Sequence, residues 1–275
     1  MDLCVTADDY GLSGAVNAAI EELAGVDAVQ AVSVMTHEGA ELDGALDLRR
    51  TGVATGLHLV FTHERPLSPA LRQSPLVGAD GRLPRSWPGL FARLMARPSL
   101  APLFAGEVEA QLQRFLALGL RLDFINGHEH AHLFPPLWPA VARVARRTGA
   151  AVRVFEGRPR ALPDRLLHLS SRACLSLDPL PGATVLRPLG IARSGRLTLA
   201  DVDRLLGSSA PVPARRGAIA ELIVHPANED RPRGGGPRDA RRHERAMLAS
   251  TAFRDLLRAH GATRTTGIVS TREAA

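Results

Sequence analysis

The sequence of 275 residues contains no lysine, because all 34 of its basic residues are arginine. With 28 acidic residues the formal net charge is +6, a sign that suits polyanionic partners. The complete replacement of lysine, together with abundant alanine, glycine and proline, is typical of GC-rich codon usage rather than of selection for binding. Aromatic residues make up only 4%, too few for the stacking surfaces of single-strand binders. The composition therefore argues against a nucleic-acid partner.

Cysteine and long apolar runs are also scarce. The two cysteines, Cys4 and Cys174, lie far apart and are expected to be small buried residues of a protein in a reducing compartment. No basic and apolar leader precedes the run "LCVTA", so no secretory signal is visible. The longest apolar stretches are too short to span a membrane. We therefore expect a cytoplasmic protein, at most peripheral at the inner membrane face.

The chain does have the composition of a folded protein, with 45% hydrophobic and 23% charged residues. Short apolar runs alternate with segments of helical period, which predicts a βα repeat and a parallel sheet. The predicted strands are 3–7, 29–36, 53–60, 121–126, 151–155, 218–226 and 265–270. The predicted helices are one capped by Ser13, then 41–50, 105–118, 136–148, 199–207 and 239–260.

About seven βα units in a chain of this length favour an α/β fold of the irregular TIM-like barrel type, as one domain over residues 1–275, although a doubly wound sheet stays open. Residues 61–104 interrupt the repeat as an insertion or lid, with one amphipathic helix near 85–97. Residues 157–200 resist assignment. The arginine- and glycine-rich stretch 231–242 is predicted to be a mobile loop before the last helix.

Polar side chains fall where four predicted strands end: Asp8 with Asp9, His58, His128 and His225. Active sites of parallel α/β folds are built at these ends. Two histidines and one carboxylate make a divalent-metal site, and the second aspartate could act as a base beside a metal-bound water. Taken alone, the Asp-Asp pair is equally typical of a turn or a helix cap.

The stretch "INGHEHAHLFPP" (125–136) also contains H-E-x-x-H, the signature of zinc proteases. That signature requires a helix, whereas here a strand-like run ends at Asn126-Gly127 and a double proline follows at once. If residues 125–132 are extended, His128, His130 and His132 share one face and Glu129 faces away. We therefore interpret the match to the protease signature as accidental.

Four motifs, taken together, resemble the YdjC-like carbohydrate deacetylases. They are "TADDYGLSGAVNAAI", "GLHL", "INGHEHAHLFP" and "IVHPA", in that order and with similar spacing, and the "RRHERAMLAS" helix fits the same pattern. The resemblance implies a TIM-like barrel, one divalent metal ion, and removal of an acetyl group from an N-acetylated amino sugar.

Position by position, the resemblance implies that Asp9, His58 and His128 hold the metal, with magnesium or zinc as first candidates. It implies that Asp8 is the base and that His225 assists the departing amine. His130 and His132 would support the ligands or line the pocket. Tyr10 and Asn126 are further candidates for substrate contact, with Trp87 and Trp138 as aromatic candidates for stacking on a sugar.

Asn126 departs from the pattern of chitooligosaccharide-type members, which usually carry aspartate there. In this respect the chain is more similar to the branch associated with hopanoid biosynthesis, which implies an N-acetylglucosaminyl group on a lipid as substrate. Chitooligosaccharides or a non-sugar amide remain alternatives, as does a non-catalytic role in which the histidines are structural.

Two further questions stay open in the sequence. The apolar face of 85–97 suits a lid over the barrel mouth better than a weak membrane contact. The oligomeric state is not fixed, and a homodimer remains an alternative to a monomer.

Overall fold

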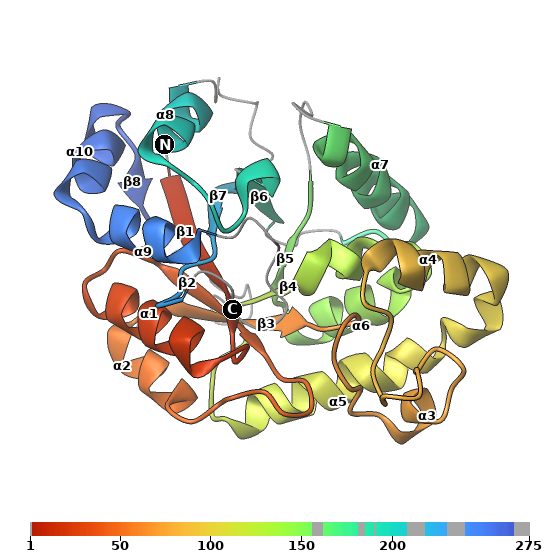
Figure 1. Cartoon of the computed structure of the whole chain (residues 1–275). Helices are drawn as coiled ribbons and strands as arrows, with labels where there is room; N and C mark the ends of the chain where they lie inside the picture. Colours follow the sequence, from red (N-terminus) through yellow and green to blue (C-terminus); the bar gives the residue numbers. More distant parts are fainter. Residues whose placement is uncertain are drawn as a thin grey trace.

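A closed barrel of parallel strands forms the centre of the protein in a computed structural model, which describes residues 2–155, 162–180, 185–189, 191–207, 218–229 and 240–266 (Figure 1). The sheet order is β2-β3-β4-β5-β6-β7-β1, and β1 also pairs with β2, which closes the ring. The strands are β1 (Asp2–Tyr10), β2 (Ala31–Met35), β3 (Ala54–Leu59), β4 (Phe124–Gly127), β5 (Ala151–Arg153), β6 (Val185–Leu189), β7 (Ala218–Val224) and β8 (Thr263–Arg264). The predicted TIM-like barrel is confirmed, and the doubly wound alternative is wrong.

Helices surround this barrel. In Figure 1, α1 and α2 lie at the lower left, α8 to α10 at the upper left, and α3 to α6 toward the right. The helices are α1 (Gly14–Gly25), α2 (Leu48–Thr51), α3 (Pro69–Arg72), α4 (Trp87–Ala96), α5 (Leu103–Ala117), α6 (Trp138–Thr148), α7 (Leu162–Leu177), α8 (Leu199–Gly207), α9 (Arg241–Ala249) and α10 (Thr251–Ala259). Short 3-10 turns are η1 (Ala45–Asp47), η2 (Pro98–Leu100), η3 (His128–Leu133) and η4 (Ile191–Arg193).

The inside of the barrel changes from apolar to polar along its axis. A lower layer takes one residue from each barrel strand: Cys4, Ala31, Ala54, Phe124, Ala151, Leu186 and Ile219. Because alternate residues of a strand face the same side, the residues two positions later form the next layer. That layer includes Thr6, Ser33, Gly56, Asn126, Arg153 and Glu221. The apolar layer fills the bottom of the barrel and leaves the polar groups above it.

The intervening residues of each strand face the helices and make the larger hydrophobic core. Val5, Val32, Leu57, Ile125 and Val152 are buried there. The helix pattern that the sequence predicts is confirmed in α1, where Val16, Ala19, Ile20 and Leu23 are buried and the Ser13 side chain caps the first turn. The two cysteines are free and buried, Cys4 inside the barrel and Cys174 on α7.

Several local predictions differ from the structure. The second predicted helix is only the turn η1 followed by the four residues of α2. The last predicted helix is two helices, because Ser250 adopts an extended conformation and its side chain caps α10. The closing strand begins earlier, at Thr263, and residues 267–270 of the predicted strand lie outside the described residues. The unassigned stretch contains α7 and β6.

The segment 61–104 contains α3, α4 and the beginning of α5. The predicted amphipathic helix is α4, which buries Leu90 and Leu94. Trp87 and Phe91 each place a ring 5.8 Å from that of Phe134 while remaining 39% exposed. Whether the segment acts as a lid stays a prediction. Of the predicted loop 231–242, residues 231–239 lie outside the described residues, whereas Arg241 and Arg242 begin α9.

Gly56 on β3 provides a test of the barrel interior. A Cβ atom at this position would lie 2.4 Å from the Phe124 ring, which fills the lower layer. We expect Gly56→Ala to lower the free energy of unfolding by about 1–3 kcal/mol, because the core would be overpacked. Urea denaturation followed by circular dichroism measures this change.

Gly25, the last residue of α1, is the matched control, since no atom lies within 4 Å of a Cβ placed there. Gly25→Ala should leave stability unchanged or raise it by up to about 1 kcal/mol. Equal stability of the two variants would contradict the packing described for the interior.

Candidate functional site

The three side chains predicted as metal ligands come together at the carboxyl end of the barrel. Asp9 lies at the end of β1, His58 near the end of β3, and His128 directly after β4. One donor atom from each lies within 4.8 Å of the other two. Asp9 Oδ1 is 3.3 Å from His58 Nε2 and 3.1 Å from His128 Nδ1. Two imidazoles and a carboxylate can hold a divalent cation and leave positions open for other ligands.

The surroundings of His58 support a metal at this position. Its Nδ1 lies 2.7 Å from Asn126 Oδ1 and donates to that amide oxygen, which directs Nε2 toward Asp9. Within the described part of the chain, this buried Nε2 has no hydrogen-bond partner. This nitrogen and the Asp9 carboxylate, 3.3 Å apart, favour a positive charge between them: burial lowers the pKa of His58, but Asp8 and Asp9 outweigh burial and raise it. A divalent cation can supply that charge in place of the proton. The donor set therefore fits a metal ion.

Asp9 is held in place from the opposite end of the sequence. Its backbone has a left-handed φ of 74°, and its Oδ2 accepts a hydrogen bond of 2.9 Å from Arg241 Nη2 on α9. Oδ1 is thereby left facing the two histidines. Burial raises the pKa of Asp9, but Arg241 and His128 lower it more, so the pKa lies well below its ordinary value. Asp9 is therefore ionised at neutral pH.

Asp8 points into the barrel, where its carboxylate is the centre of a hydrogen-bond network. Oδ1 accepts hydrogen bonds from Ser33 Oγ at 2.6 Å and from Asn126 Nδ2 at 3.1 Å. Oδ2 accepts one from Arg153 Nη1 at 2.5 Å. Burial raises the pKa of Asp8, but the Arg153 charge outweighs burial and holds the pKa below its ordinary range. Asn126 thus joins His58 to Asp8 through one amide.

Arg153 is fully buried between two carboxylates. On the side away from Asp8, its Nε and Nη2 donate to the two oxygens of Glu221 at 2.8 and 2.7 Å. Sequence reasoning missed Arg153, Glu221, Ser33 and Arg241. A signal for the first two was present, because each is a charged residue inside an otherwise apolar strand ("AVRVF" and "AIAELIV"). Such residues are seldom fully buried unless they are paired.

His225 follows β7 and faces the same group. Burial lowers the pKa of His225 to about 4, although Asp9 and Asp8 act in the opposite direction, so the ring is neutral at pH 7. Its backbone N–H donates to Glu244 Oε1 at 2.5 Å, and Glu244 Oε2 accepts from the Leu197 backbone N–H at 3.0 Å. Glu244 lies one turn after Arg241 on α9, so this helix contacts both Asp9 and the His225 backbone.

The turn η3 separates the three histidines of "HEHAH" instead of placing them on one face. Glu129 and His130 adopt left-handed conformations, so the extended alternative for 125–132 is wrong, and no continuous α-helix forms either. The His132 ring turns away from the ligand group, with Nε2 3.0 Å from the Arg153 carbonyl oxygen. His130 packs its ring 5.1 Å from Phe155. This turn does not have the helical geometry of a zinc protease.

Two of the aromatic candidates belong to the core. The Tyr10 hydroxyl donates to Glu21 Oε1 on α1 at 2.6 Å, and Trp138 Nε1 donates to the Asp178 carbonyl oxygen at 2.9 Å. Both rings are fully buried, and Tyr10 does not join the ligand group, because its side chain packs against the helix layer. Trp87 is the one of the three candidates that is exposed.

Backbone strain is concentrated at this end of the barrel. Of the five non-glycine residues with positive φ in the described chain, four are Asp9, His63, Glu129 and His130. Each such conformation costs about 1–3 kcal/mol and persists only where surrounding contacts impose it. His63 and Glu129 lie opposite each other, with His63 Nε2 3.3 Å from Glu129 Oε1. Strain of this kind is typical of functional sites.

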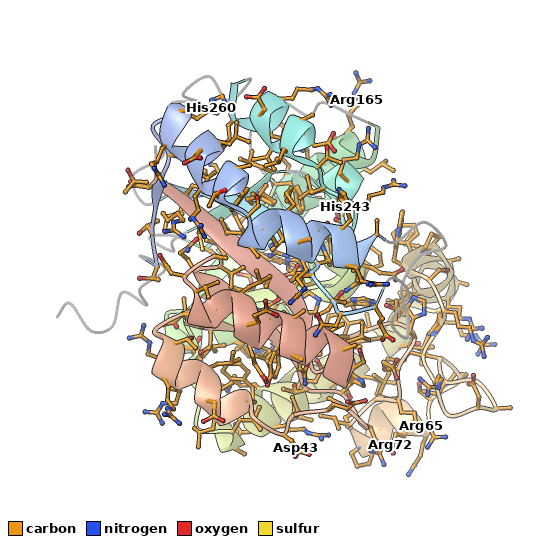
Figure 2. The ribbon with its side chains drawn as sticks, turned by 60° about the vertical axis from the view of Figure 1, so that its left-hand side comes forward. Asp43, Arg65, Arg72, Arg165, His243 and His260 are labelled. Carbon is orange, nitrogen blue, oxygen red and sulfur yellow. The ribbon has the colours of Figure 1, made fainter. Side chains whose placement is uncertain are left out.

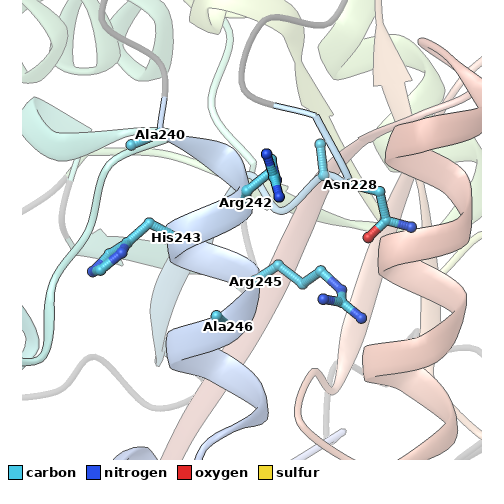
Figure 3. A pocket seen from close by; sticks show the side chains of 7 residues that line it. Asn228, Ala240, Arg242, His243, Arg245 and Ala246 are labelled. Atoms are coloured by element: carbon cyan, nitrogen blue, oxygen red, sulfur yellow. The ribbon is translucent and has the colours of Figure 1, made fainter.

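A separate hollow of about 670 Å³ opens to solvent beside α9 (Figure 3). Its lining includes Asn228, Arg242, His243 and Arg245, and Figure 3 shows His243 on the opposite side of the helix from Arg245. Arg245 pairs with Glu22 of α1, with Nε 3.1 Å from Oε2. None of the three predicted metal ligands lines this hollow, so it is distinct from the ligand group.

The buried Asp8–Arg153–Glu221 group leads to a stability prediction. Arg153→Met removes the only cation that either carboxylate contacts within the group and leaves two buried negative charges. Loss of one partner from a buried ion pair costs about 3–5 kcal/mol, and we expect that loss in urea denaturation. Arg147→Met is the control, because Arg147 pairs with Glu109 at 2.8 Å on the surface and should cost less than about 1 kcal/mol. Similar losses would contradict a special role for Arg153.

His37, two residues beyond β2, gives a pH prediction. Burial lowers the pKa of His37 to about 4 from an ordinary value of 6.5. Between these values the unfolded chain binds a proton that the folded chain does not, so stability falls as the pH falls from 6.5 toward 4. We expect His37→Gln to reduce the stability loss between pH 7 and pH 4.5 by about 2 kcal/mol. An unchanged pH dependence in the variant would refute this assignment.

Comparison with known proteins agrees with this architecture. A "Chitooligosaccharide deacetylase" from Enterobacter sp. (strain 638) is 32% identical over 232 residues, which cover 83% of this chain and 82% of that protein. A protein of the same name from Salmonella paratyphi B (strain ATCC BAA-1250 / SPB7) is 33% identical over 236 residues, with the same coverage.

A solved structure from Enterococcus faecalis V583, of a protein named for cellobiose-phosphate cleavage, superposes with a TM-score of 0.73. It covers 96% of each chain at 20% identity and shows that the barrel is shared. Residues 2–259 match the family described as YdjC-like protein. On this match and on the identity with its curated relatives, the chain belongs to the YdjC-like family.

Proposed function

We propose that this protein is a metal-dependent hydrolase that removes the acetyl group from an N-acetylated amino sugar. The observation that carries the proposal is the grouping of Asp9, His58 and His128, with Asp8 and His225 beside them, at the carboxyl end of the barrel. The names of the curated relatives support an amide of an amino sugar as the substrate class.

Within that class we propose a lipid-linked N-acetylglucosaminyl group, as on a hopanoid, ahead of a chitooligosaccharide. The proposal rests on Asn126, the position at which the sequence departs from the chitooligosaccharide-type pattern. In the structure the Asn126 amide accepts from His58 and donates to Asp8 at the same time. An aspartate could not donate to Asp8, so residue 126 affects the charge balance beside the ligands.

Asp9, His58 and His128 would hold the cation, with magnesium or zinc as first candidates. A bound divalent cation would supply Lewis acidity at the acetamide carbonyl and lower the pKa of a water molecule. The chain contributes the geometry of the donors. Arg241 holds one oxygen of Asp9, and Asn126 fixes the ring tautomer of His58.

We propose Asp8 as the base. Its carboxylate stays ionised because of Arg153, and its two oxygens are fixed by four donated hydrogen bonds. Fixed orientation favours proton transfer, but a depressed pKa makes Asp8 a weak base. The proton that it takes from the attacking water must therefore move on quickly.

His225 is suited to receive that proton. Because its pKa is about 4, the ring is neutral at pH 7 and holds no proton of its own to donate as an acid. It can protonate the leaving nitrogen only after it has accepted a proton, and the attacking water supplies one. Glu244 holds the backbone of His225 in position for this transfer. The amine then leaves as a neutral group, which an amide anion could not do at neutral pH.

The segment 61–104 is proposed to cover the mouth of the barrel through α4. Its rings contact Phe134, which follows η3, so the helix stands beside the site. Among the described residues no helix is long and apolar enough to cross a membrane. A weak peripheral contact through the exposed faces of Trp87, Phe91 and Met95 would suit a lipid-linked substrate.

Metal content and acetate release test the proposal together. We expect wild type to bind one divalent ion per chain and to release acetate from an N-acetylglucosaminide, and His128→Ala to lose both. The substrate panel contains chitooligosaccharides, a lipid-linked glycoside and a non-sugar acetamide. The control is His260→Ala. His260 follows α10 (Figure 2) and pairs with Asp203. It precedes β8, which pairs with the amino end of β1, whereas the site lies at the carboxyl end.

Each outcome has a definite meaning. Metal with acetate released from a sugar supports the deacetylase, and the preferred glycoside decides between the lipid and the oligosaccharide. Metal with release from the non-sugar acetamide alone would identify a different amidohydrolase. Absence of bound metal after reconstitution with magnesium, zinc, manganese and cobalt would mean that the histidines are structural.

A further inference from the structure

His63 and Glu129 form a polar pair beside the ligand group that the proposed reaction does not use. The pair joins the beginning of the segment 61–104 to η3, with Nε2 and Oε1 3.3 Å apart. The side chains are 26% and 27% exposed, so solvent reaches both. The His63 ring centroid lies 5.9 Å from that of His128. The pair therefore borders one of the predicted metal ligands on a side that a ligand can approach.

The backbone that presents this pair is strained and well supported. His63 has a φ of 64° and Glu129 a φ of 52°, which are unfavourable for residues with a Cβ atom. Around His63, the backbone N–H donates to the Pro84 carbonyl oxygen at 3.0 Å and the carbonyl oxygen accepts from Arg82 Nη1 at 3.1 Å. The same Arg82 nitrogen pairs with Glu64 at 2.5 Å. A surface ion pair alone would not require such support.

The pair does not suit a second metal ion. Within the described residues, only Asp9, His58 and His128 bring three such donors within 4.8 Å of one another. One carboxylate opposite one imidazole also gives little net charge when the imidazole is protonated, so a strongly charged ligand gains little here.

Its remaining hydrogen-bond capacity suits hydroxyl groups. Glu129 Oε2 is buried and makes no hydrogen bond of good geometry with any described residue, so it is not the atom that an approaching ligand meets. Oε1, which faces His63 Nε2 in the partly exposed pair, has a second lone pair that can accept from a hydroxyl, and the second ring nitrogen of His63 offers another polar contact. Two neighbouring hydroxyl groups of a sugar ring present donors and acceptors at similar spacing. A few placed polar groups of this kind orient a ligand in its pocket.

We propose that His63 and Glu129 form a subsite that binds hydroxyl groups of the sugar ring carrying the acetamido group. This inference rests on the proposed function for the identity of the ring. The subsite would orient the sugar so that its acetamide lies at the ligand group. It would bind the substrate without taking part in proton transfer.

Sugar binding and turnover are measured in Glu129→Gln and His63→Asn, because glutamine preserves size and asparagine tolerates a positive φ. In metal-free protein, we expect Glu129→Gln to weaken binding of N,N′-diacetylchitobiose at least about tenfold in an NMR titration. In metal-loaded protein, KM should rise by a similar factor, with kcat changed less than about threefold. His63→Asn should act in the same direction, and the affinity for the metal should stay within about twofold of wild type in both variants.

Monodeoxy analogues of an N-acetylglucosaminide identify the hydroxyl. If Glu129 binds a given hydroxyl, kcat/KM of wild type should be about tenfold lower on the analogue without that hydroxyl than on the parent glycoside. In Glu129→Gln, kcat/KM should be the same on the two compounds. Glu109→Gln is the matched control, because Glu109 pairs with Arg147 on the surface of α5 and is expected to leave every value unchanged.

The outcomes separate this inference from the proposed function. Equal sugar binding in wild type and Glu129→Gln overturns the subsite, even if acetate is released. Binding that depends on Glu129 in a protein that releases no acetate supports the subsite and overturns the deacetylase. Absence of sugar binding in wild type overturns the subsite, and it overturns the deacetylase as well if no glycoside of the panel releases acetate.

Discussion

The buried ion pair between Asp8 and Arg153 is the interaction on which the rest of the site depends. The Arg153 guanidinium donates two hydrogen bonds to Asp8 and two to Glu221, and all three residues are fully or almost fully buried. Without a cation between them, two carboxylates buried together in the barrel would destabilise the folded chain. The orientation of Asp8 fixes Asn126, and through Asn126 the ring of His58. The polar upper part of the barrel is thus one connected network.

The site is also a meeting point of segments distant in the sequence. Asp9 is bound by Arg241, 232 residues away, and Asp8 by Arg153, 145 residues away. Left-handed backbone at Asp9, His63 and Glu129 adds a local energetic cost that these long-range contacts offset. The site therefore exists only in the folded chain, and no isolated βα unit could reproduce it.

Sequence patterns predicted the barrel and the positions of Asp9, His58 and His128, because strand periodicity and polar residues at strand ends are local signals. They did not predict the path of "HEHAH". The left-handed residues Glu129 and His130 reverse the alternation that an extended strand would have, and only contacts with distant segments impose such conformations. Tyr10 was a candidate for substrate contact as one of the few aromatic residues, but its hydroxyl donates to Glu21 and its ring belongs to the core. Arg153 and Glu221 were missed because their pairing joins β5 to β7 across the barrel.

The apolar lower layer of the barrel limits the route by which a molecule can reach the ligand group. Cys4, Ala31, Ala54, Phe124, Ala151 and Leu186 close the barrel at the end opposite Asp9, so access to the ligand group is from the carboxyl ends of the strands. Any molecule that reaches the ligand group must enter and leave by the same mouth. In the proposed hydrolysis the substrate would enter, and both products would leave, at this one end of the barrel.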